Sequence, residues 1–75
     1  MSDTRRFTAM IYREGGGYVA LCPELDVASQ GDSVEDASSN LREAVELFLE
    51  SADPSEVLAR THDAVFFAAL EVRAG

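Results

Sequence analysis

Alternating side chains between positions 6 and 13 predict a first β-strand that is fairly apolar on both faces. One face carries Phe7, Ala9 and Ile11, and the other carries Thr8, Met10 and Tyr12. The glycines at 15–17 favour a hairpin turn, because glycine adopts positive φ without steric cost. We therefore expect a second strand, from Tyr18 to Cys22, to return antiparallel.

Pro23 lacks a backbone N–H, which ends the second strand or confines it to a sheet edge. A loop over 24–26 then leads to a short third strand over 27–30. Gly31 allows a sharp turn, and the run Ser-Val-Glu-Asp from Ser33 has the pattern of a capping box. A helix is predicted to start there.

Apolar residues recur every three or four positions after this cap, which predicts an amphipathic helix ending near Ser51-Ala52. The predicted buried stripe is Val34, Ala37, Leu41, Ala44, Val45 and Phe48, which Leu47 and Leu49 widen. Asp53-Pro54 then starts a short helical turn that runs through Leu58.

The run from Asp63 to Arg73 is apolar on both faces and rich in Val, Phe and Leu, which favours a fourth strand, although its length also permits a helix. The predicted order β-β-β-α-β defines one domain over 1–75, in the α+β class. It is a two-layer sandwich, with a mainly antiparallel sheet and one long helix over one face.

The sheet face opposite the helix is predicted to carry more apolar surface than a monomer exposes, because large exposed apolar patches usually mark interfaces. Its residues are Met10, Tyr12, Val65 and Phe67. We therefore expect a homodimer or a higher homo-oligomer that buries them.

Charge is strongly unbalanced, with 14 acidic residues against 6 arginines and a formal net charge of −8 at pH 7. Direct nucleic-acid binding is not expected, because it relies on cationic side chains at phosphates. A basic protein partner is favoured, although acidic residues can also serve solubility alone. No membrane span or signal peptide is evident, and the lone Cys22 fits a reducing, cytoplasmic setting.

Few residues suggest chemistry, and we expect no catalytic residue, cofactor or metal. Cys22 is interpreted as a buried, inert thiol, and the adjacent pair His62-Asp63 as a solvated loop pair rather than a catalytic dyad. A metal-dependent nuclease or a ligand-binding remnant is the alternative. It would require convergence of Glu43, Glu46 and Glu71, without a carboxylate from the first strand.

The longest signal is an ordered pattern across the centre of the chain. It reads Tyr-Val-Ala-Leu-Cys-Pro-Glu-Leu from Tyr18, Gln-Gly-Asp-Ser-Val-Glu-Asp-Ala from Gln30, and Asn-Leu-Arg-Glu-Ala from Asn40. This pattern resembles the HicB family of antitoxins and covers 18–49 closely. The resemblance implies a reduced ribonuclease H-like fold that binds and neutralises a basic HicA-like, mRNA-cleaving toxin. An orphan HicB-like protein without a toxin is a second possibility.

One feature of the HicB family is not expected in this chain. HicB antitoxins commonly carry a C-terminal DNA-binding segment, and no basic helix follows the last predicted strand here, so operator binding by this chain alone is not expected.

The predicted partner-binding residues are Tyr18, Glu24, Leu25, Asp26 and Gln30. Two acids flanking a leucine would meet a basic groove, or else Leu25 plugs the end of the core while the acids are solvated.

Overall fold

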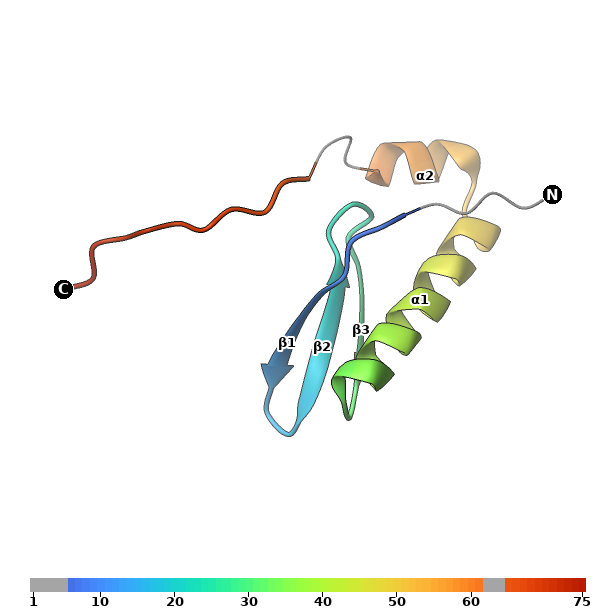
Figure 1. Ribbon diagram of the computed structural model, residues 1–75. Helices are drawn as coiled ribbons and strands as arrows, with labels where there is room; N and C mark the ends of the chain where they lie inside the picture. The colour runs from blue at the N-terminus through green and yellow to red at the C-terminus, as the bar shows by residue number, and fades with distance from the viewer. Residues whose placement is uncertain (1–5, 62–64) are drawn as a thin grey trace.

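A computed structural model of the protein describes residues 6–61 and 65–75. Within these ranges the order is β1 (Met10–Glu14), β2 (Gly17–Cys22), β3 (Val27–Gly31), α1 (Val34–Ser51) and α2 (Pro54–Arg60). The strands form one antiparallel sheet in the order β1-β2-β3, and α1 covers one of its faces (Figure 1). This arrangement confirms the predicted α+β class and the antiparallel sheet with one long helix.

Both tight connections at one end of the sheet depend on glycine. Gly15 has a φ of +60° in the turn that joins β1 to β2. At Gly31, a Cβ would lie 2.5 Å from the backbone nitrogen of Ala37, which is closer than real side chains approach. The last residue of β3 therefore packs directly against the first turns of α1.

The start and the end of α1 lie close to where the sequence predicts them. Ser33 is the N-cap, and its Oγ accepts a hydrogen bond of 3.0 Å from the backbone N–H of Asp36. After Ser51 the backbone N–H of Ala52 donates to the carbonyl of Phe48 at 2.9 Å. Val34 departs from the predicted stripe, because it lies at the first turn and is 44% exposed.

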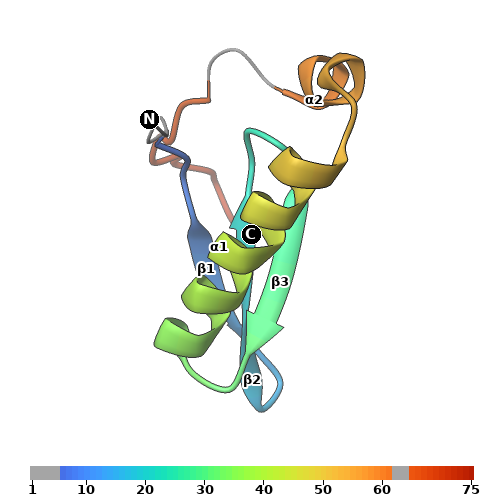
Figure 2. The ribbon, with the colours of Figure 1, turned by 90° about the vertical axis from the view of Figure 1, so that its right-hand side faces the viewer.

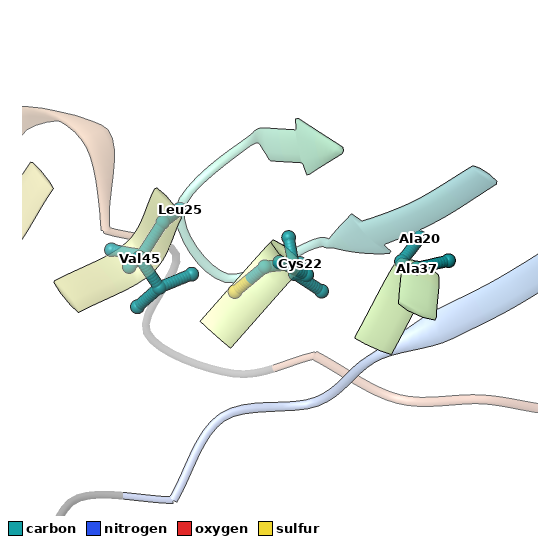
Figure 3. Close-up of a cluster of buried hydrophobic side chains, with 6 residues drawn as sticks. Ala20, Cys22, Leu25, Ala37 and Val45 are labelled. Atoms are coloured by element: carbon teal, nitrogen blue, oxygen red, sulfur yellow. The ribbon is translucent and has the colours of Figure 1, made fainter. Parts of the chain in front are cut away.

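The core is thin and lies between the sheet and α1 (Figure 3). Among the described residues, its buried members are Ala20, Cys22 and Leu25 from β2 and the loop after it, and Ala37, Leu41 and Val45 from α1. Small side chains face each other at one end, where Ala20 lies beside Ala37. Leu25 supplies the largest fully buried side chain.

The predicted fourth strand is wrong for the residues that the structure describes. None of the residues 65–75 belongs to a strand, and the segment runs away from the sheet on the side opposite α1 (Figures 1 and 2). Phe66 and Leu70 are 88% and 84% exposed. An apolar sequence with high β propensity indicates that a segment suits a pleated, half-buried surface. It does not show that a neighbouring strand is present to pair with it. Positions 62–64 lie outside the described residues.

The sheet face opposite α1 is open and partly apolar. Met10 pairs with Leu21 and Tyr12 pairs with Val19, so these side chains share that face. Met10 is 40% exposed and Tyr12 is 45% exposed. The predicted location of Met10 and Tyr12 away from the helix is confirmed, whereas their burial in an oligomer stays a prediction.

Candidate functional site

The loop between β2 and β3 turns Leu25 inward. The backbone N–H of Leu25 donates to the carbonyl of Cys22 at 3.3 Å, and Asp26 adopts a left-handed conformation with φ of 56°. The side chain of Leu25 is fully buried. It therefore does not project toward a partner between two acids, and the alternative, that it plugs the end of the core, fits the structure.

Glu24 beside it connects the loop to the segment before β1. Its carboxylate accepts hydrogen bonds from the backbone N–H of Thr8, at 3.0 and 3.1 Å, and from the Thr8 hydroxyl at 2.6 Å. Burial alone would raise the pKa of Glu24, but the hydrogen bonds from Thr8 outweigh burial and hold that pKa below its ordinary value. Glu24 is thus a structural clamp in this structure, and Asp26 is the exposed acid of the loop.

Cys22 lies behind this clamp and is a buried free thiol. Burial raises the pKa of the Cys22 thiol, and the nearby Glu24 carboxylate acts in the same direction. A thiol with a raised pKa carries less of the nucleophilic thiolate. The predicted burial of Cys22 is confirmed, and its environment offers no activation.

Tyr18 and Gln30 lie at the opposite end of the sheet from this loop, because Tyr18 pairs with Gly31 and Cys22 pairs with Val27. The five predicted partner-binding residues are therefore divided between two separate places. Tyr18 and Gln30 both line an open depression of about 460 Å³. The backbone carbonyl of Gln30 also accepts a hydrogen bond of 2.8 Å from the side chain of Asn40 in α1.

Three carboxylates line the same depression, which we call the acidic depression. They come from three places in the fold: Glu14 at the end of β1, Asp32 after β3, and Asp36 in the first turn of α1. The guanidinium of Arg13 lies 5.9 Å from the centre of the Tyr18 ring, within range of a cation–π interaction. The acidic depression thus combines negative charge with an aromatic face, a combination suited to cationic side chains.

The sequence interpretation missed Glu14, Asp32 and Asp36 as a group. Glu14 precedes the predicted hairpin turn and Asp32 follows the predicted third strand. In an antiparallel meander the end of the first strand, the start of the second and the end of the third meet at one end of the sheet. That topology, taken together with the helix cap, contained a signal for their proximity.

No group of three or more His, Cys, Asp or Glu side chains is arranged to hold a metal ion in the part of the chain that the structure describes. Glu43, Glu46 and Glu71 are all described, so they do not converge on a common point. The pair His62-Asp63 lies outside the described residues. Neither described helix is long and apolar enough to cross a membrane.

The fold and the depression define a small α+β domain with an acidic, open surface at one end of its sheet. The chain is similar to two proteins of Synechocystis sp. (strain ATCC 27184 / PCC 6803 / Kazusa). It is 47% identical to the UPF0150 protein ssr1765 over 47 residues, which are 60% of each chain. It is 45% identical to the UPF0150 protein ssl0738 over 38 residues, or 49% of this chain and 53% of that protein.

The protein thus has homologues among UPF0150 proteins, and it spans between half and two thirds of the length of these curated relatives. No family model matches the chain. No solved structure matches it either.

Proposed function

We propose that the protein is an interaction module of the HicB antitoxin type, which binds and neutralises a basic, HicA-like, mRNA-cleaving toxin in the cytoplasm. Two findings support the proposal. One is the ordered HicB-like pattern between positions 18 and 49. The other, which carries the proposal, is the acidic depression, where three exposed carboxylates lie together with the half-buried ring of Tyr18.

The charge distribution suits this function. A net charge of −8 accelerates encounter with a basic partner, because complementary long-range fields steer association. Once in contact, arginine or lysine side chains of the toxin would pair with Glu14, Asp32 and Asp36. The Tyr18 ring already attracts a cation, since the guanidinium of Arg13 lies 5.9 Å from its centre.

This assignment moves the contact surface relative to the sequence prediction. Tyr18 and Gln30 stay in the proposed surface because they line the acidic depression. Glu24 and Leu25 leave it, because one is bound to Thr8 and the other is buried. Asp26 is exposed at the far end of the sheet and would contact only a partner that reaches both ends.

Other functions have less support. A metal-dependent nuclease would need carboxylates that converge, and Glu43, Glu46 and Glu71 do not. A direct nucleic-acid binder would need positive charge at its surface, and the depression is acidic. An orphan protein without a toxin would share the fold and the depression, so it is separated from an antitoxin only by experiment.

The test is titration calorimetry against any small basic protein that is encoded next to this gene. The variant combines Glu14→Gln, Asp32→Asn and Asp36→Asn. We expect affinity to fall by roughly tenfold, since three partly exposed ion pairs at about 0.5 kcal/mol each amount to roughly 1.5 kcal/mol. The loss should shrink as salt is added, because salt screens exposed charges.

The matched control removes the same number of charges elsewhere, through Glu43→Gln, Glu50→Gln and Glu56→Gln. All three are exposed and none lines the acidic depression. An equal loss in both variants would show that net charge, and not this depression, governs binding. Absence of binding by the unmodified protein, or of any neighbouring gene for a small basic protein, would refute the antitoxin proposal.

A further inference from the structure

A groove of about 1200 Å³ with a mainly apolar lining lies on the helix side of the sheet, next to the segment over 6–9 that leads into β1. α1 packs mainly on β3 and β2 and contacts β1 little, which leaves this side of the sheet less covered. Phe7, Leu41, Val45, Leu49 and Val57 are among the residues that line it. We call it the β1-side groove. Its lining comes from the segment before β1, from α1 and from α2.

The sheet edge beside this groove is open. β1 pairs with β2 on one side, and no strand among the described residues pairs with its other side. An edge strand presents free N–H and C=O groups that form hydrogen bonds with an added strand. No proline interrupts β1. The groove at 6–9 therefore continues into the free edge of β1, and the two together leave room for one more strand.

The C-terminal segment over 65–75 has the properties of the missing strand. It is extended, and alternate positions place Phe66 with Leu70 on one face and Val65 with Phe67 on the other. Phe66, Leu70 and Val72 are 88%, 84% and 73% exposed, so they have almost no apolar surroundings within their own chain. At about 3.3 Å per residue the segment reaches roughly 35 Å, which exceeds the length of β1.

The segment does not approach the β1-side groove of its own chain. It leaves on the side of the sheet opposite α1 (Figure 1), whereas residues of α1 line the groove. The Cα radius of gyration is 14.5 Å, against roughly 11 Å for a compact chain of this length. Within the described residues, the protein thus has an extended apolar segment that pairs with no strand. It also has a free strand edge, that of β1, with which no segment pairs.

We propose that residues 65–75 of a second copy add to the free edge of β1, and that the exchange is reciprocal. The face with Phe66 and Leu70 enters the β1-side groove, and the face with Val65 and Phe67 joins the open sheet face. A twofold exchange of this kind closes on itself, so the β1 edge of each copy is paired. It would also bring the predicted oligomer residues side by side, because Met10 and Tyr12 lie on that open face.

Like charge on the two copies opposes this association, so apolar burial and strand pairing have to drive it. The dimer should accordingly become tighter as salt is added, whereas toxin binding should become weaker. The proposal deepens the expected homo-oligomer and requires no toxin. Its failure is therefore distinguishable from failure of the proposed function.

The first test is the solution mass by light scattering after size exclusion. The unmodified protein should have a mass of about 16.2 kDa, or 2 × 8.1 kDa. Phe66→Asp with Leu70→Asp should reduce it to 8.1 kDa. The control, Val34→Asp with Leu47→Asp, adds the same charges at exposed positions of α1 outside the groove and should remain dimeric. Circular dichroism should show that both variants stay folded.

The second test separates exchange between copies from folding back within one copy. In a Cys22→Ala background, chains with Ala9→Cys are refolded with chains with Ala68→Cys and then oxidised. Ala9 lines the groove and Ala68 lies in the segment. We expect a covalent dimer with one chain of each kind. Chains with Ala28→Cys, which lies exposed in β3 away from β1, are the control for Ala68→Cys and should not form it.

Three results would overturn the proposal. The first is a mass of 8.1 kDa for the unmodified protein at micromolar concentration. The second is an internal disulfide in monomers that carry both Ala9→Cys and Ala68→Cys. The third is a dimer that survives Phe66→Asp with Leu70→Asp but dissociates with Tyr12→Asp, because that result indicates face-to-face packing of two sheets.

Discussion

Leu25→Ala is the most direct test of the role of the loop between β2 and β3. Among the described residues, Leu25 has the largest fully buried side chain. Truncating a buried leucine to alanine typically costs about 2 to 5 kcal/mol, which includes the cavity left behind. Leu25 lies in a loop that can partly collapse, so we expect a loss of about 2 to 3 kcal/mol in the free energy of unfolding.

A loss of that size is large for this protein. A chain of this length has a total stability of roughly 4 to 11 kcal/mol, from the usual range per residue. Urea unfolding followed by circular dichroism measures the change. Leu47→Ala is the matched control, because Leu47 is 54% exposed and lies outside the β1-side groove, so its truncation should change stability by no more than about 0.5 kcal/mol.

The reasoning would be refuted by equal and small effects of the two substitutions. Such a result would mean that Leu25 does not fill the core in solution. If Leu25→Ala also weakened binding to a basic toxin while leaving the urea midpoint unchanged, the loop would belong to the interface after all. The structure predicts the opposite order, with stability lost first and binding lost only through unfolding.

Three further substitutions test the clamp, the β3–α1 junction and the helix cap. Glu24→Gln should cost about 1.5 to 3 kcal/mol at neutral pH, because the charged hydrogen bonds to Thr8 are lost. The lowered pKa of Glu24 means that its contribution is present above its ordinary value of 4.5 and disappears as the pH falls through the folded-state pKa. The stability of Glu24→Gln should therefore depend less on pH in the acidic range than the stability of the unmodified protein. Identical curves of unfolding free energy against pH for the two proteins would contradict the clamp. Gly31→Ala should cost about 1 to 3 kcal/mol or more in thermal unfolding, since the new methyl group meets the backbone of Ala37, and an unchanged melting temperature would contradict that contact. Ser33→Ala should cost about 1 kcal/mol in urea unfolding, and a neutral result would show that the cap contributes nothing.

Local features of the fold could be predicted well from the sequence. The hairpin follows from glycines between two alternating segments, and the observed strands begin and end near the predicted residues. The start of α1 follows from Ser33 and the acids after it. These predictions depend on backbone preferences and on side-chain periodicity, which act within a few residues and need no knowledge of the rest of the chain.

The candidate site was predicted only in part. Tyr18 and Gln30 lie in the acidic depression, but Glu14, Asp32 and Asp36 join them because the β1–β2 turn and the β3–α1 connection meet at one end of the sheet. Leu25 was expected to point either outward or inward, and only its packing against the core decides between the two. Adjacency in sequence misled here, because Glu24 and Asp26 flank Leu25 and yet occupy different environments.

The sequence by itself determined the strands of the hairpin, the capped helix and the excess of apolar and acidic surface, since each is a property of short stretches or of composition. Tertiary structure decided which acids gather, that Glu24 binds Thr8 rather than solvent, and that 65–75 forms no strand within the described chain. The physical reason is that a strand and a charged cluster both need partners distant in sequence. A local pattern shows that a segment requires a partner, whereas the packing of the whole molecule determines whether its own chain provides one.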